Sequence, residues 1–124
     1  MLSVLIIERD PIVAEQLRAR LLALRYTVVG VRSNFWEALF DLPHPCRGPD
    51  LILLHHETGG DDRVRAMGRI VRLLYRSQVL LLSSCRYATR LETEFNVLHK
   101  PFTARQLKHC MYQLHNPTEI QLSP

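Results

Sequence analysis

The feature that most constrains this chain is an alternation of short apolar runs with amphipathic segments along its length. Runs such as VLII, LILL and VLLL are apolar without a break, which is typical of strands buried on both faces of a sheet. The segments between them repeat their apolar residues at the period of a helix. Strands that alternate with helices predict right-handed crossovers and a parallel sheet with helices on both faces. We expect strands at 3–8, 26–31, 51–55, 78–84 and 95–99. We expect helices at 11–24, up to 42 after a cap at Ser33 or Asn34, at 61–75, and after a cap at Thr103, with at most two turns of helix at 86–94. The apolar face of the helix at 61–75 is expected to comprise Val64, Met67, Val71 and Leu74.

Five such units fit a single doubly wound α/β domain over residues 1–115, with a five-stranded parallel sheet of flavodoxin-like order 2-1-3-4-5. Residues 116–124 are expected to form a frayed C-terminal tail. In such a sheet, functional residues lie at the carboxyl ends of the strands. These ends carry Glu8-Arg9-Asp10, His55-His56, Ser83-Ser84 and His99-Lys100-Pro101.

The composition is that of an ordinary globular protein, with 47% apolar and 23% charged residues. No apolar stretch is long enough to cross a bilayer, and Asp10 and Glu15 interrupt the N-terminal run where a signal peptide needs its apolar centre. We therefore expect a cytoplasmic protein with no membrane partner. The three cysteines are widely spaced, which favours reduced thiols. The net charge of +4 permits an acidic partner without requiring one.

Several short motifs occur in a set order, namely VLIIERDP, EAL, PDLILLH, VLLLSS and HKPF. In this order and spacing they resemble the receiver domain of two-component response regulators, over residues 3–115. The resemblance implies a pocket in which an aspartate accepts a phosphoryl group from a donor held by Mg²⁺. Acidic residues that follow the first strand bind this Mg²⁺ ion in the family. A hydroxyl group and a lysine then stabilise the phosphorylated aspartate. The resemblance also implies a cis bond between Lys100 and Pro101.

The chain departs from this family at the residues that carry the chemistry. His55 stands at the place of the phosphoacceptor aspartate, and Arg9 stands at the place of the acid that binds Mg²⁺ directly. Imidazole cannot form the acyl phosphate, and the guanidinium puts a fixed positive charge beside the metal position. Val97 replaces the switching aromatic residue, and the interval from Ser83 to Lys100 is several residues short. We interpret the chain as a pseudo-receiver with a lost Mg²⁺ site, no other cofactor and no catalytic residue.

The degenerate phosphorylation-site pocket is expected to comprise Glu8, Arg9, Asp10, His55, Ser83, Lys100 and Pro101. Within it we expect Glu8 to pair with Lys100 or Arg9. His55 is expected to hydrogen-bond nearby, so that the chain's own charges hold the cleft. Two other interpretations of His55 stay open: an imidazole that accepts a phosphoryl group, and a pH switch beside a carboxylate. A zinc site is disfavoured, because the neighbours His55 and His56 point to opposite faces of a strand.

Two surface features make a candidate partner surface. The first is an arginine stripe on one helix, with arginines spaced i, i+4, i+7 and i+11 at Arg65, Arg69, Arg72 and Arg76. The stripe is either a solvated outer face or a docking site for an acidic partner or a nucleic-acid backbone. The second is the pair Trp36 and Phe40, which lie one helical turn apart. They are either exposed contact residues or packed under the following loop.

These observations predict an atypical, phosphorylation-independent receiver-like module that acts in signalling by protein–protein interaction and is not an enzyme. The family commonly pairs through its fourth helix, fifth strand and fifth helix, so a homodimer is a further expectation. The alternatives are a phospho- or pH-responsive regulator that uses His55, and a basic nucleic-acid-binding adapter that uses the arginine stripe. Nucleic acid is the less favoured partner, since the sequence offers no helix-turn-helix to read bases.

Overall fold

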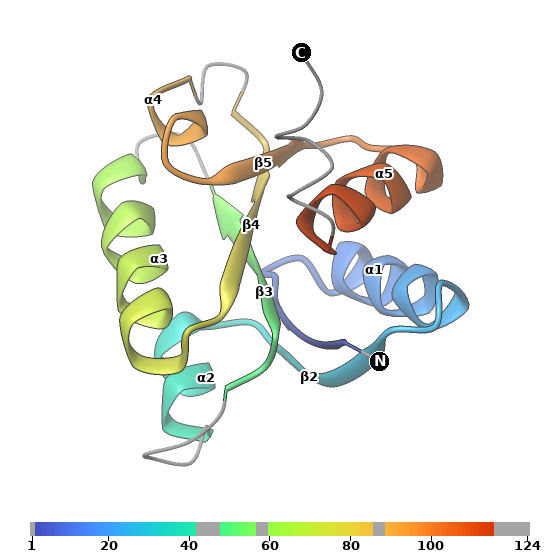
Figure 1. Ribbon diagram of the computed structural model, residues 1–124, viewed down its shortest axis with the longest axis horizontal. Coiled ribbons are helices and arrows are strands. Elements are labelled where there is room, and N and C mark those ends of the chain that lie inside the picture. The colour runs from blue at the N-terminus through green and yellow to red at the C-terminus, as the bar shows by residue number, and fades with distance from the viewer. Residues whose placement is uncertain (1, 42–47, 57–59, 86–88, 116–124) are drawn as a thin grey trace.

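The computed structural model describes residues 2–41, 48–56, 60–85 and 89–115 (Figure 1). Within these residues, the sheet has five parallel strands in the order β2-β1-β3-β4-β5. The elements in chain order are β1 Ser3–Ile7, α1 Pro11–Ala23, β2 Thr27–Arg32, α2 Phe35–Asp41, β3 Leu51–His56, α3 Asp61–Tyr75, β4 Gln78–Ser83, α4 Thr89–Glu92, β5 Asn96–His99 and α5 Ala104–His115. The doubly wound fold and its strand order, as expected from the sequence, are confirmed.

Helices cover both faces of the sheet, with α2, α3 and α4 on one side and α1 and α5 on the other (Figure 1). Successive residues of a strand point to opposite faces, so each strand contributes to two cores. In β3, Ile52 and Leu54 belong to the core with α2 and α3, whereas Leu51 and Leu53 belong to the core with α1 and α5. The same alternation decides which residues can meet at the carboxyl edge of the sheet.

Side-chain caps begin three of the helices near that edge. Asp10 accepts hydrogen bonds from first-turn amides of α1, and Pro11 occupies the first helical position. Asn34 Oδ1 accepts a hydrogen bond from the Trp36 amide at 2.8 Å, so Asn34 is the cap of α2. Thr103 Oγ1 accepts one from a first-turn amide of α5 at 3.1 Å, as the sequence predicts. These caps fix where the chain leaves each strand and turns back across the sheet.

The buried face of α3 differs from the expectation at one position. The sequence predicts Leu74 on the apolar face, but Leu74 is 55% exposed and Tyr75 is buried instead. The buried residues of α3 are Val64, Gly68, Val71 and Tyr75. Gly68 is among them because the Phe95 ring packs against the helix there, 2.6 Å from where a Cβ would stand. This close approach of helix and ring turns Tyr75 rather than Leu74 toward the sheet.

The fourth helix is short, as the sequence predicts. Only Thr89–Glu92 form α4, while residues 86–88 of the expected helix lie outside the described residues. The expected tail at 116–124 lies outside them as well. In the part of the chain that the structure describes, no helix has the length and apolar character needed to cross a membrane.

Candidate functional site

The carboxyl edge of the sheet holds a buried carboxylate that is paired with a lysine. Glu8 follows β1 and is only 2% exposed, so its side chain is almost removed from water. Lys100 follows β5 and donates hydrogen bonds from Nζ to Glu8 Oε1 at 2.9 Å and to Oε2 at 2.8 Å. A buried carboxylate without a partner would be strongly unfavourable. The lysine therefore allows Glu8 to be ionised inside the protein.

His55, near the end of β3, joins this pair from the neighbouring strand. Its Nδ1 lies 2.8 Å from Lys100 Nζ and 3.3 Å from Glu8 Oε1. An ammonium group can only donate, so an unprotonated Nδ1 accepts from Lys100, whereas a protonated Nδ1 donates to Glu8. The shorter distance favours the first arrangement, in which the ring is neutral. We call Glu8, His55 and Lys100 the edge network.

The edge network keeps Glu8 ionised. Burial alone raises the pKa of Glu8, but the His55 and Lys100 side chains that contact it outweigh this effect. Together with the Asp10 amide, which donates to Glu8 Oε1 at 3.2 Å, they lower its pKa from the usual 4.5 to about 2. Glu8 is therefore a carboxylate at neutral pH, and both of its oxygens already accept hydrogen bonds.

Ser83 is absent from the edge network, which corrects the expectation that it lies in the same pocket as His55. Ser83 pairs in register with His56, and its Oγ lies 2.8 Å from His56 Nδ1. Because side chains alternate along a strand, the residue that follows His55 points to the opposite face of the sheet. Ser83 shares that opposite face. Its side chain is therefore directed away from the network, although its carbonyl accepts a hydrogen bond from the Lys100 amide at 2.7 Å.

His56 forms the centre of a second polar cluster, which the sequence analysis did not identify. The side chain is completely buried. Its Nε2 lies 2.7 Å from Asp61 Oδ1 at the start of α3, while Nδ1 faces Ser83. Both ring nitrogens are thus satisfied, as buried polar groups require. The cluster ties β3, β4 and α3 together and leaves His55 alone to face Lys100.

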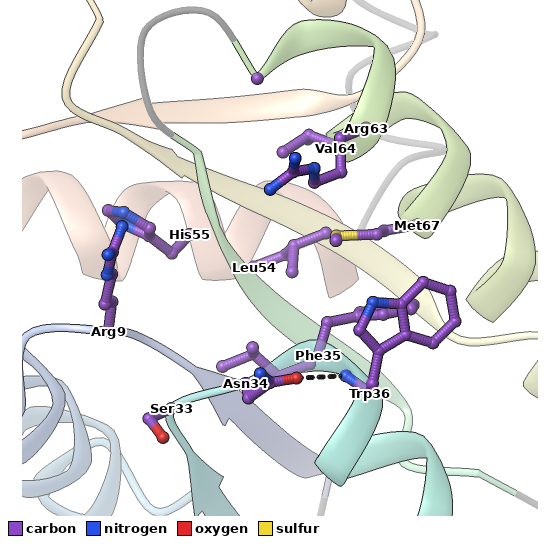
Figure 2. A pocket seen from close by; sticks show the side chains of 12 residues that line it. Arg9, Ser33, Asn34, Phe35, Trp36, Leu54, His55, Arg63, Val64 and Met67 are labelled. Atoms are coloured by element: carbon purple, nitrogen blue, oxygen red, sulfur yellow. Dashed lines mark hydrogen bonds between the residues drawn. The ribbon is translucent and has the colours of Figure 1, made fainter.

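The other residues expected in the pocket lie around the edge network. Asp10 uses its carboxylate to cap α1 and contacts Glu8 only through its amide. Arg9 is exposed, and its side chain extends toward His55 (Figure 2). The bond between Lys100 and Pro101 is cis, which confirms what the resemblance implies.

The donor set at this edge does not fit Mg²⁺. This ion requires several oxygen ligands in near-octahedral geometry. Glu8 supplies a carboxylate, but Lys100 holds both of its oxygens, and the Asp10 carboxylate is directed to the first turn of α1. His55 presents a nitrogen to an ammonium group. Among the described residues, no group of three or more His, Cys, Asp or Glu could hold a metal ion.

Comparison with known proteins identifies the fold. No protein-family model matches the sequence, and no curated protein matches it. The receiver domain of a modulated diguanylate cyclase from Desulfovibrio desulfuricans G20 is 24% identical, with 98% of each chain covered and a TM-score of 0.75. The chain has the fold of a receiver domain. A response regulator receiver domain from Clostridium thermocellum is 19% identical over 98% of this chain and 100% of its own, with a TM-score of 0.74. CheY6 from R. sphaeroides is 24% identical over 91% of this chain and 95% of its own, with a TM-score of 0.66.

The arginine stripe of α3 is largely occupied by contacts within the chain. Arg69 Nε lies 2.6 Å from Glu94 Oε1, and Arg65 Nε lies 3.4 Å from Glu94 Oε2. Arg72 donates to the Glu94 carbonyl at 2.7 Å, and its guanidinium lies 4.2 Å from the centre of the Phe95 ring. Arg76 ends α3 in a left-handed conformation, with φ of 54°. These contacts hold α3 against the segment before β5 and favour the solvated, structural interpretation of the stripe.

The aromatic pair on α2 is exposed, with Trp36 at 53% and Phe40 at 89%. Trp36 also borders a cavity of about 410 Å³ between α2, α3 and the ends of β1 and β3. Arg9 and His55 lie on one side of this cavity, and Trp36 lies on the other (Figure 2). Arg63 lines it as well, a residue that the sequence analysis did not single out.

Proposed function

We propose that this chain is a receiver-fold signalling module whose output is independent of phosphorylation and that acts by binding another protein. The observation that carries the proposal is the position of His55, 2.8 Å from Lys100 Nζ in a network that also contains the buried Glu8. In the family that the sequence resembles, the corresponding lysine stabilises a phosphoryl group. Here the chain's own carboxylate and imidazole contact that lysine in place of a phosphoryl group.

The proposal extends to the chemistry of the site. The described residues at this edge present no free carboxylate to a phosphodonor, since Glu8 is paired and Asp10 caps a helix. The fixed cation at Arg9 opposes binding of a divalent ion. We therefore propose that the chain is a pseudo-receiver, not an enzyme, and that its cleft stays in one state.

A protein is the partner that the surface favours. Exposed aromatic side chains such as Phe40, at 89%, are enriched where proteins contact one another. Among chains of this fold, CheY6 was solved in complex with the phosphorylated P1 domain of CheA3. We propose a protein partner of this chain in the cytoplasm, and a second copy of the chain is the alternative occupant. Light scattering of the purified chain, with and without the Phe40→Ser substitution, separates a homodimer from a monomer.

The test of phosphorylation independence is the intact mass of the chain after incubation with Mg²⁺ and acetyl phosphate. We expect no added phosphoryl group on the wild type or on His55→Asp, because Arg9 still occupies the metal position. The double variant Arg9→Asp, His55→Asp restores both groups and should gain one phosphoryl group, which serves as the positive control. A phosphoryl adduct on the wild type that His55→Gln abolishes would refute the proposal in favour of a phosphohistidine.

A second candidate function, a pH response, is favoured by the placement of His55 Nδ1 between an ammonium group and a carboxylate. Protonation of the ring would exchange its hydrogen bond from Lys100 for one to Glu8. An NMR titration between pH 5 and 8 that follows the His55 ring nitrogens distinguishes the two. A ring that stays neutral throughout supports the fixed network, and a ring that titrates while Lys100 shifts supports the switch.

A further inference from the structure

A second site lies beside the edge network, on the face of the sheet that α2 and α3 cover. The cavity of about 410 Å³ found there has a volume within the range of pockets that hold small molecules. We propose that this cavity binds a small planar anion of about the size of a nucleoside monophosphate, with its ring against Trp36 and its anionic group between Arg9 and Arg63. The inference goes beyond the proposed function and does not rest on it.

The charge of the cavity wall favours an anion. The described residues that line the cavity include the guanidinium groups of Arg9 and Arg63 and no carboxylate. Figure 2 shows the nitrogen-bearing end of Arg63 extending from α3 toward the side where Arg9 and His55 lie. Guanidinium groups present a planar fork of donors that matches the oxygens of a phosphate or a carboxylate. Two of them from separate elements can hold one anionic group from two sides.

Three described acidic residues near the cavity each have a partner within the chain. Asp61, at the start of α3, lies 2.7 Å from His56 Nε2, on the same face of the sheet as the cavity. Asp62 Oδ1 accepts from Arg65 at 3.2 Å. Glu8, whose Oε1 lies 3.3 Å from His55 Nδ1, accepts hydrogen bonds from Lys100 on both oxygens. Each of these three described carboxylates therefore already has a partner within the chain.

The start of α3 contributes in the same sense. Gly60 lines the cavity and precedes the first turn of this helix of 15 residues, and no side chain caps it. The amino end of a helix carries a partial positive charge and amides that lack partners within the helix. An anionic group at this rim would thus lie near the two guanidinium groups and the amino end of the helix, whose first turn also carries the paired Asp61 and Asp62.

The opposite wall suits a planar ring. Trp36 is 53% exposed, and its ring meets the Phe35 ring edge to face, with centroids 5.1 Å apart and planes at 83°. Figure 2 shows Met67 beside the Trp36 indole, across the cavity from Arg9. The hydrogen bond from the Trp36 amide to Asn34 fixes the start of α2 and so limits the motion of this wall. An indole face held in this way can stack on an aromatic ligand.

The test uses the fluorescence of Trp36, the only tryptophan of the chain, as a direct reporter of the cavity. The probes are AMP, salicylate, adenosine and inorganic phosphate, titrated into the purified protein. We expect saturable quenching by AMP or salicylate, and weaker binding of adenosine and phosphate, which each lack one half of the ligand. Tighter binding of AMP identifies a phosphate as the anionic group, and tighter binding of salicylate identifies a carboxylate.

Two exposed arginines provide matched variants. Arg63→Gln should weaken binding of the better probe by about tenfold or more, since it removes a charge-assisted hydrogen bond. Arg105→Gln, on the exposed side of α5, should change it less than about twofold. The proposal is overturned if neither AMP nor salicylate gives saturable quenching, if adenosine or phosphate binds as tightly as either, or if Arg63→Gln has no effect. The phosphodonor experiment is independent of all these outcomes.

Discussion

The substitution Lys100→Met removes the ammonium group from the edge network and keeps most of the side-chain volume. Glu8 would then remain 2% exposed without the cation that now contacts both of its oxygens. Breaking a buried ion pair by removing one partner costs about 3–5 kcal/mol. The lowered pKa of Glu8, from 4.5 to about 2, corresponds to about 3 kcal/mol in favour of the ionised form at ~1.4 kcal/mol per pKa unit, and this figure combines the effects of burial, His55, Lys100 and the Asp10 amide.

The assay is urea unfolding at pH 7 of the wild type, Lys100→Met, Glu8→Gln and the double variant. We expect Lys100→Met to lower the free energy of unfolding by about 3 kcal/mol, a large part of the ~5–15 kcal/mol of a typical domain. In the double variant most of this loss should be absent, because an amide replaces the stranded charge, giving a coupling of about 2 kcal/mol or more. Lys108→Met on the exposed side of α5 is the control and should cost less than ~0.5 kcal/mol. Additive losses, with no coupling between positions 8 and 100, would refute the reasoning.

Three further predictions follow from the same structure. Because the pKa of Glu8 is lowered in the folded state, its contribution to the free energy of unfolding is complete above pH 4.5 and is lost as the pH falls to about 2. Urea unfolding of the wild type across this range should show a loss of about 3 kcal/mol that Glu8→Gln lacks, and equal losses in the two proteins would contradict this prediction. His56→Leu removes a buried hydrogen bond to Ser83 and a partly buried one to Asp61, and it should cost about 2 kcal/mol by the same method; a cost below ~0.5 kcal/mol would contradict this. Asn34→Ala removes the cap of α2 and should cost about 1 kcal/mol in thermal unfolding, whereas an unchanged melting temperature would deny the cap any role.

Much of the fold could be predicted because the relevant signals are local. Apolar runs and helical periodicity placed the strands and helices, Thr103 marked one helix start, and the structure chose Asn34 over Ser33 as the cap of another. The alternation of side chains along a strand was equally available, yet Ser83 was assigned by its place in a family motif rather than by its face of the sheet. Counting from the core residues of β4 would have paired it with His56.

The remaining features depend on contacts between segments far apart in the chain. The contacts of Glu94 with the arginine stripe disfavour its interpretation as a docking site, and Glu94 lies 25 residues beyond Arg69 in the chain. The cavity beside Trp36 depends on how α2 and α3 pack over the strand ends. Neither helix by itself indicates that Arg63 and Trp36 face a shared space.

The most direct test of the edge network is an NMR titration with Mg²⁺ and beryllofluoride, a stable analogue of a bound phosphoryl group. The signals to follow are the Glu8 side-chain carboxyl carbon and the Lys100 ammonium nitrogen. We predict that neither signal shifts through the millimolar range, because the carboxylate, the imidazole and the ammonium group already satisfy one another. A saturable shift of both signals, at a concentration that leaves the rest of the spectrum unchanged, would contradict the claim that these three side chains fill the pocket.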